Sequence, residues 1–210
     1  MANQPNPGGR RYAGLDPAER ARQRRAALLD AAQELFGDRG YQATSVKQLC
    51  AHAGLTERYF YESFRDREAA LTAVYDKLVD GLRGTTLAAV AGHDGSADMV
   101  PRGLDAFVGF LVADQRRARI VLVEVVGVSA ALEARRHAVL TEFAGLLGER
   151  WLSDVEPGTQ RRLTTIALVG AVNHLLVDWL LSGRTRRPEE LVQACAALFA
   201  GARDRLVADG

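Results

Sequence analysis

Four consecutive residues have side chains that could recognise the base edges of nucleic acid: Thr56, Glu57, Arg58 and Tyr59. An arginine guanidinium can donate two hydrogen bonds to guanine, and a glutamate carboxylate can accept one from the N4 amine of cytosine. A tyrosine adds a flat ring and a hydroxyl, which can bind a phosphate oxygen. Such chemistry requires a rigid element that presents these side chains together at an exposed end.

The surrounding segment, residues 44–71, predicts such an element. Ser45 can cap a short helix, with Gln48 completing a capping box. Gly54 follows the apolar face of that helix, where a turn needs a positive φ, and Thr56 is a suitable N-cap for a second helix. A short helix, a glycine turn and a second helix with long polar side chains at its start are typical of a DNA-binding helix-turn-helix.

Two further contacts can be placed at the start of the first short helix. Thr44 and Ser45 begin it, and free backbone N–H groups together with the helix dipole can hold a phosphate there.

Cys50 falls on the inner face of the same short helix, which favours a small buried residue over a redox switch. Asp66 can cap a third helix that begins just after the segment.

The longer pattern resembles the DNA-binding domain of the TetR family of bacterial transcriptional regulators. It joins Arg25–Ala32, Glu34–Phe36 and Gly40–Tyr41 to the downstream run from Phe60 to Leu71, and it covers roughly residues 20–71. The resemblance implies that Tyr61 and Arg67 contact phosphates. Glu57-Arg58 stands where the family often has Lys-Gly, so a different base preference is expected.

The rest of the chain predicts an all-α protein of about nine helices. We expect a flexible arm at 1–14, a helix-turn-helix domain at 15–65 and a helical ligand-sensing and dimerisation domain at 66–210. The run 120–123 is rich in β-branched residues, but helical flanking segments and the lack of a partner strand favour a helix. Gly92–Ser96 is the clearest break.

The segment 159–182 is apolar on nearly all sides, so more than one neighbour must cover it. The resemblance implies a homodimer through this helix and the one beginning at Pro188; a purely internal core helix is the alternative. The resemblance also implies a pocket for a small molecule, and we expect that ligand to be apolar. Candidate ligand contacts, each with an ordinary core or hydrogen-bonding role as its alternative, are Phe107, Phe110, Glu124, Asn173, His174 and Trp179.

Composition and motifs argue against other classes of protein. The net charge is +1, and residues 1–71 carry only a small basic excess. The two cysteines and four histidines show no metal spacing, and no phosphate loop, nucleophile elbow or HExxH motif is present, so we expect no cofactor, no metal and no enzyme. No apolar run approaches a membrane span and no signal peptide is visible, which predicts a cytoplasmic, nucleoid-associated protein.

The expected function is a sequence-specific transcriptional regulator, a repressor released from a pseudo-palindromic double-stranded operator when ligand binds. Ligand would shift the dimer towards a form with a different spacing of its recognition helices, with the helix after Asp66 as the lever. The alternative is a helical ligand-binding or scaffold protein without site-specific DNA binding. A third hypothesis is an enzyme that uses His174 and Asp178.

Overall fold

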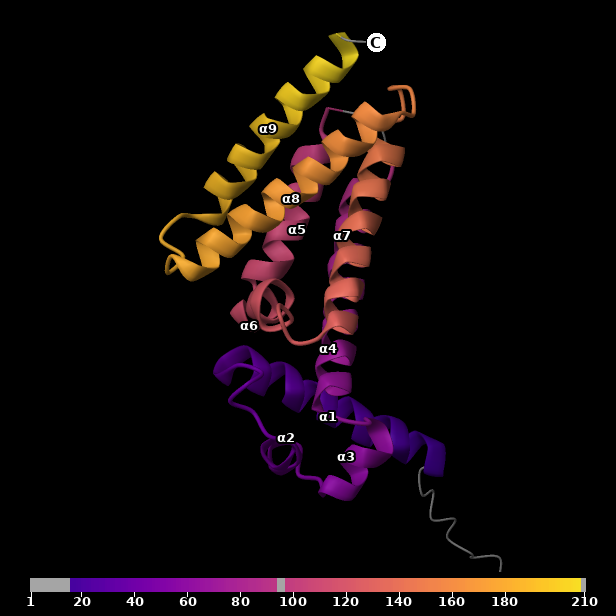
Figure 1. Ribbon diagram of the computed structural model, residues 1–210, viewed down its shortest axis with the longest axis vertical. Helices are drawn as coiled ribbons and strands as arrows, with labels where there is room; N and C mark the ends of the chain where they lie inside the picture. The colour runs from indigo at the N-terminus through magenta and orange to yellow at the C-terminus, as the bar shows by residue number, and fades with distance from the viewer. Residues whose placement is uncertain (1–15, 94–96, 209–210) are drawn as a thin grey trace, which may run out of the picture.

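The computed structural model describes residues 16–93 and 97–208, and within these ranges the chain is all-α, as predicted (Figure 1). The predicted arm, residues 1–14, and part of the Gly92–Ser96 break lie outside the described residues. The described part holds nine α-helices and one π-helical segment. They are α1 Pro17–Arg39, α2 Val46–His52, α3 Glu57–Ser63, α4 Arg67–Val90, α5 Met99–Val112, α6 Gln115–Arg119, η1 Ile120–Glu124, α7 Ala130–Trp151, α8 Thr159–Leu181 and α9 Pro188–Ala208.

Side-chain caps set several of the helix starts. Ser45 accepts the Gln48 N–H while the Gln48 side chain accepts the Ser45 N–H, so the predicted capping box is present. Asp66 caps α4 by accepting the Ala69 N–H at 2.7 Å. Thr56 occupies the N-cap position of α3, but its side chain makes no capping hydrogen bond. Local sequence therefore positions α2 and α4 more firmly than α3, which must depend on packing.

The β-branched run at 120–123 is helical, which confirms the preference for a helix over a strand. It forms η1, in which Ile120 and Leu122 are buried. The wider π turn is rare and is found mostly as a single turn at functional sites. In this protein η1 follows directly on α6 and lies between α1 and the C-terminal bundle.

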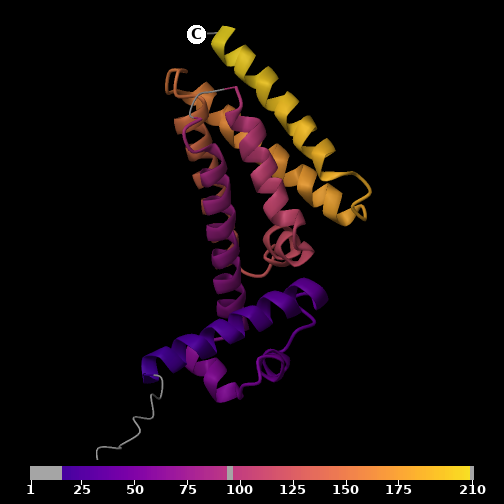
Figure 2. The ribbon, with the colours of Figure 1, turned by 180° about the vertical axis from the view of Figure 1, so that it is seen from behind.

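Two apolar clusters form the core, and α4 contributes to both. Val74 and Tyr75 pack in the cluster that unites α1, α2 and α3, whereas Leu82 and Val90 pack in the cluster of the C-terminal bundle. Figures 1 and 2 show α4 rising from the N-terminal helices alongside α7 into that bundle. Helix α4 is therefore a packed element that both clusters share.

Helices α8 and α9 leave large apolar side chains exposed on the outside of the bundle. These are Leu163, Ile166 and Leu181 on α8, and Leu198 and Val207 on α9. Among the described helices, α8 is also the one whose length and mean hydropathy of 1.5 would suffice to cross a membrane, although only 28% of its most apolar window is buried. This match is by length and composition only, and Asn173, His174 and Asp178 interrupt the apolar run, so the expectation that no uncharged apolar run reaches the length of a membrane span is not contradicted. An exposed apolar helix of this kind needs a covering partner.

Candidate DNA-binding site and ligand cavity

The turn between α2 and α3 is held by backbone geometry. Gly54 has φ +66°, the left-handed conformation that favours glycine, as predicted. Its N–H donates to the carbonyl of Ala51, and the N–H of Leu55 donates to the carbonyl of Cys50 at 2.9 Å. These bonds close the C-terminus of α2 and direct the chain into α3 without a flexible loop.

Helix α3 is fixed from its inner side by α1. Phe64 is buried, the guanidinium of Arg25 lies 4.2 Å above its ring, and Arg25 also donates to the carbonyl of Ser63 at 2.9 Å. Arg24 lies 4.4 Å above the ring of Tyr59, which is half-buried. Two stacked arginines thus clamp the end and one edge of α3. Tyr59 can contact DNA only through the part of its ring that Arg24 leaves open.

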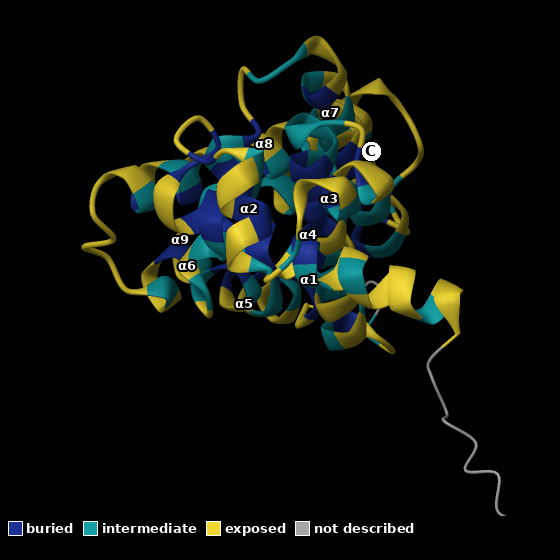
Figure 3. Cartoon of the chain, turned by 90° about the horizontal axis from the view of Figure 1, so that it is seen from below, coloured by how far each residue is buried: buried dark blue, intermediate teal, exposed yellow. Residues whose placement is uncertain are grey.

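The start of α3 presents its polar side chains to solvent. Thr56, Glu57 and Arg58 are exposed, and Tyr61 is 58% exposed. Figure 3 views the molecule from the end that carries α2 and α3 and shows their outer faces as exposed. Arg58 donates to Glu62 at 3.0 Å, but its side chain is 83% exposed, and exposed pairs of this kind contribute little. The guanidinium of Arg58 can therefore leave Glu62 and donate hydrogen bonds to a base or a phosphate instead.

The backbone N–H of Thr44, which was predicted to help hold a phosphate, donates to the carbonyl of Tyr41 at 3.3 Å. Thr44 is fully buried, and its hydroxyl lies 2.8 Å from the carbonyl of Gly40. Its own carbonyl accepts a 2.7 Å hydrogen bond from Arg67, whose guanidinium also lies 4.3 Å from the ring centre of Tyr41. Thr44 is thus a structural residue of the α1–α2 loop. Ser45 remains exposed at the start of α2.

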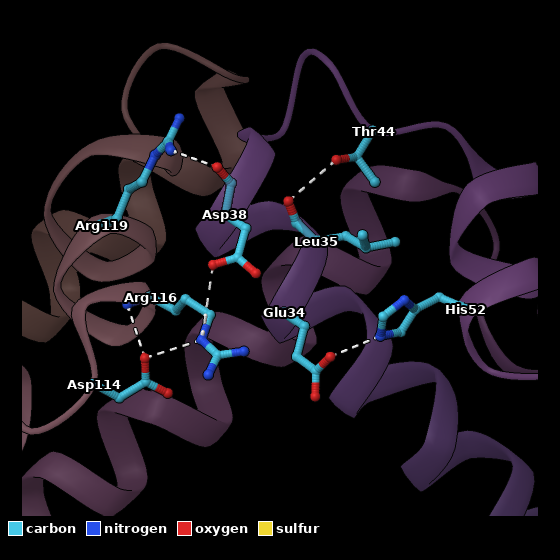
Figure 4. A network of polar contacts seen from close by, with 8 residues as sticks. All are labelled: Glu34, Leu35, Asp38, Thr44, His52, Asp114, Arg116 and Arg119. Atoms are coloured by element: carbon cyan, nitrogen blue, oxygen red, sulfur yellow. Dashed lines mark hydrogen bonds and ion pairs between the residues drawn. The ribbon is translucent and has the colours of Figure 1, made fainter.

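Glu124 was expected to contact a ligand, but it binds the N-terminal helices instead. Its carboxylate accepts the backbone N–H of Tyr41 at 2.7 Å and Arg119 Nε at 2.7 Å, and its side chain is only 12% exposed. Arg119 in turn donates to the carbonyl of Asp38 at 3.0 Å (Figure 4). Gly40 lies between them, so that a Cβ there would meet the Glu124 carboxylate at 3.2 Å. We call these contacts the η1 latch: Glu124, Arg119, Asp38 and Tyr41.

Helix α6 packs against the C-terminal turn of α1 at Gly37. A Cβ at this position would lie 2.8 Å from the Cα of Arg116 and closer still to its Cβ. Arg116 donates to Asp114 at 3.1 Å and faces Asp38 at 3.9 Å, as Figure 4 shows. Hydrogen bonding by Asp114 raises the pKa of Arg116. The two halves of the molecule therefore meet at a close backbone approach beside the η1 latch.

A cavity of about 150 Å³ lies between α4, α5, η1, α7 and α8, with one contact from α9. Its walls are almost wholly apolar, and Val121 and Leu122 of η1 form part of them. An apolar molecule that entered this cavity would remove its own apolar surface and that of the walls from water, which is favourable.

The cavity takes in only some of the predicted ligand residues. Phe107 and Asn173 line it, and Phe107 packs edge-on against Phe143 at 5.6 Å between ring centres. Phe110 lies outside it, near Gly81 and beneath Arg117. His174 is exposed. Trp179 is buried in the core and donates to the carbonyl of Arg186 at 3.1 Å. The cavity is therefore not lined by four of the predicted ligand residues: Glu124, Phe110, His174 and Trp179.

Polar groups at one end of the cavity have an unusual environment. Burial raises the pKa of Tyr75 to about 12, although nearby Arg136 and Arg135 act to lower it, so the phenol is neutral. Arg136 also lines the cavity, and its buried Nε has no hydrogen-bond partner among the described residues. The sequence analysis did not identify Arg136 as a candidate ligand contact, because only the fold shows that its neighbours in the cavity wall are apolar.

Neither cysteine is arranged for chemistry. Both Cys50 and Cys195 are buried, and burial raises the pKa of each thiol, with Glu57 adding to the effect at Cys50. Within the described residues no three His, Cys, Asp or Glu side chains are grouped as metal ligands. Asp178 pairs with Arg186 at 2.9 Å while His174 is exposed, so the pair has no enclosed site in which to catalyse a reaction.

Comparisons with known sequences agree with this geometry. Residues 28–74, which run from α1 into α4, match the model of the bacterial regulatory proteins of the tetR family. The chain is 28% identical over 114 residues to the helix-turn-helix-type transcriptional activator FasR of Mycolicibacterium smegmatis, covering 54% of this chain and 51% of that one. It is 32% identical over 80 residues to a transcriptional repressor of Mycobacterium tuberculosis, covering 38% and 40%. The chain thus spans about half the length of the curated relatives that it matches, or less.

Solved structures extend the likeness to the whole fold. The fatty acid degradation regulator FadR of Bacillus halodurans has a TM-score of 0.72 at 16% identity, covering 88% of this chain and 95% of that one. FadR of Bacillus subtilis, solved with stearoyl-CoA, has a TM-score of 0.71 at 17% identity, covering 82% and 96%. With the capped α2, the glycine turn and the exposed start of α3, these matches show that residues 28–74 resemble bacterial regulatory proteins of the tetR family and that the described fold is similar to that of the two FadR structures.

Proposed function

We propose that this protein is a sequence-specific DNA-binding transcriptional regulator, and that it represses its target until a small apolar ligand releases it. The observation that carries the proposal is the exposed start of α3, where Glu57 and Arg58 project from a helix that α1 holds in place. Side chains on a fixed helix can read base edges in a major groove, whereas side chains on a mobile loop cannot do so with the same precision.

The residues divide into base-reading and phosphate-binding groups. Arg58 would donate to a guanine and Glu57 would accept from a cytosine, with Thr56 and Tyr59 beside them at the groove. Tyr61, the most exposed aromatic residue of α3, would bind a phosphate. Ser45 would present the N-terminus of α2 to a second phosphate. Arg67 would support this end by holding the Thr44 carbonyl, and its remaining N–H groups would face the DNA backbone.

A homodimer would cover the exposed apolar side chains of α8 and α9. A single helix-turn-helix reads few base pairs, and a two-fold dimer doubles the site. On α8 the exposed residues recur at helical spacing along one face, from Leu163 through Ile166 and His174 to Leu181. His174 would then lie on this face, with Asp178 and its partner Arg186 beside it, and contacts across the interface would account for polar residues within an apolar helix.

Release by ligand would use the two elements that border both the cavity and the N-terminal helices. Leu82 and Tyr75 of α4 line the cavity, and Arg67 at the start of the same helix holds the α1–α2 loop. Val121 of η1 lines the cavity, and Glu124 at its end holds Tyr41. A ligand that favours one position of α4 and η1 would shift the population of dimers towards a spacing that does not fit the operator.

A salt-dependent gel shift tests the DNA-binding part of the proposal. The purified protein is titrated against DNA that flanks its own gene and against unrelated DNA of equal length. A band specific to the flanking DNA, weakening steeply as salt rises, supports the proposal. No site-specific band would favour the alternative of a helical ligand-binding or scaffold protein.

A further inference from the structure

The guanidinium of Arg136 has unused hydrogen-bonding capacity at the wall of an apolar cavity. Its Nε is buried without an acceptor among the described residues, and its closest carboxylate oxygen, on Glu133, is 3.7 Å from a terminal nitrogen. Glu133 already accepts the Gly127 N–H at 2.7 Å through its other oxygen. A guanidinium carries five N–H donors, and buried donors without acceptors are rare in folded proteins.

The other arginines that line the cavity differ from Arg136 in this respect. Arg83 is bound by Asp80 and by Glu142, one on its own helix and one on α7. Arg150 also has an interaction partner. Arg135, the sequence neighbour of Arg136, points elsewhere and donates to Asp76 at 2.8 Å. A requirement for an additional acceptor is therefore specific to Arg136.

Apart from Arg136 and Arg150, the residues of α7 that line the cavity are apolar. Its wall on α7 runs through Val139, Phe143 and Leu147 to the turn of Arg150. These positions span about 21 Å at 1.5 Å per residue, and α4 lines the same path from Tyr75 to Val90. This length suits an extended acyl chain of the kind found in common fatty acids and is far longer than a compact ring compound needs.

We propose that the cavity binds a long-chain carboxylate, with its alkyl chain along α7 and its carboxylate accepting hydrogen bonds from Arg136. The assignment rests on the proposed function, because it names the ligand class of the same regulatory cavity. A carboxylate can accept two parallel N–H bonds from a guanidinium and also neutralises its charge. A thioester carbonyl would accept a hydrogen bond but add no negative charge beside a guanidinium whose ion pair with Glu133 is long, at 3.7 Å, so the free acid is favoured over its coenzyme A ester.

The test measures binding of three probes to the purified full-length protein by isothermal titration calorimetry: palmitate, hexadecanol and palmitoyl-CoA. Palmitate should bind the wild type more tightly than either other probe. In Arg136→Met the affinity for palmitate should fall about 10- to 100-fold, the range for loss of charge-assisted hydrogen bonds, while hexadecanol binding is unchanged. Arg136→Lys, which keeps the charge, should retain part of the palmitate affinity.

Arg135→Met is the matched control, since it removes an arginine from the same turn of α7 that does not line the cavity. It should bind palmitate like the wild type. Without ligand, Arg136→Met should unfold at a temperature no lower than the wild type, because it replaces an unpaired buried donor with an apolar side chain. That result separates loss of binding from loss of folding.

Three outcomes would overturn the assignment: no palmitate binding, equal losses in Arg136→Met and Arg135→Met, or palmitoyl-CoA binding that is tighter than palmitate and insensitive to Arg136. Operator binding is measured on the same samples without ligand. A protein that binds its operator but not palmitate refutes the ligand class alone, whereas one that binds palmitate but no operator refutes the proposed function alone.

Discussion

The carboxylate of Glu124 accepts the backbone N–H of Tyr41 at 2.7 Å, across 83 positions of sequence. Glu124 ends η1, whose Val121 and Leu122 border the cavity, and Tyr41 belongs to the loop that leads from α1 into α2. One short π-helical turn therefore contacts both the ligand cavity and the N-terminal helices. In the proposed regulation, the Glu124–Tyr41 hydrogen bond would link the cavity to the N-terminal helices, and substitution of Glu124 would remove that link.

Glu124→Ala should lower the free energy of unfolding by about 1–3 kcal/mol, because it leaves the Tyr41 N–H and Arg119 without their acceptor. Glu124→Gln should cost less, since its amide oxygen can still accept the Tyr41 N–H. Urea denaturation measures both, with exposed Glu156→Ala as the control. Equal stability of Glu124→Ala and Glu156→Ala would show that the η1 latch does not hold the two halves together.

Gly37→Ala should destabilise the protein by about 1–3 kcal/mol, because the new methyl group would overlap the backbone of Arg116 and push α6 away from α1. Gly145→Ala is the matched control: it lies inside α7 with no atom within 4 Å of an added Cβ, and there alanine should stabilise by about 0.5–1 kcal/mol. Thermal unfolding of both variants checks the contrast. A neutral Gly37→Ala would mean that α6 is not packed on α1 as described.

Arg67→Ala should weaken operator binding on all sequences and reduce the slope of log affinity against log salt by about one, if its free N–H groups bind a phosphate. Loss of the Thr44 hydrogen bond and of the Tyr41 contact should also lower stability by about 1 kcal/mol. Gel shifts at several salt concentrations separate these effects. Lower stability with an unchanged slope would assign Arg67 a structural role only.

Tyr75 makes the stability of the protein sensitive to alkaline pH. Its pKa rises from an ordinary value of 10.0 to about 12 on folding, chiefly through burial. The folded state therefore keeps a proton that the unfolded state loses, so this contribution is complete below about pH 9 and falls as the pH rises from 10 towards 12. Denaturation curves of the wild type and Tyr75→Phe should diverge over that window. Parallel curves would show that Tyr75 is not buried as described.

The parts of the fold that the sequence predicts well are those governed by neighbouring residues. The Ser45–Gln48 capping box, the positive φ of Gly54 and the cap at Asp66 each depend on groups within a few positions. The helical rather than extended form of residues 120–124 was also predictable, since the helices on both sides constrain it. Short-range hydrogen bonding is read directly from residue type and spacing.

The roles that sequence reasoning missed depend on groups far apart in the chain. Thr44 looked like an exposed helix start, but it is buried within the α1–α2 loop and its hydroxyl donates to the carbonyl of Gly40. Glu124 looked like a polar residue facing a ligand, but its acceptors serve Tyr41 and Arg119. The sequence did not identify Arg136, because the lack of a hydrogen-bond partner for its Nε depends on its neighbours in space.

The most direct test of the account is footprinting of the wild type and Arg58→Ala on DNA that flanks the gene. The wild type should protect a two-fold symmetric site, and Arg58→Ala should lose about 1–3 kcal/mol there and tolerate substitutions at one base pair in each half-site. Arg102→Ala, an exposed arginine on α5 far from α3, should protect like the wild type. No protected site for the wild type, or equal weakening of Arg58→Ala on every sequence, would contradict base reading by α3.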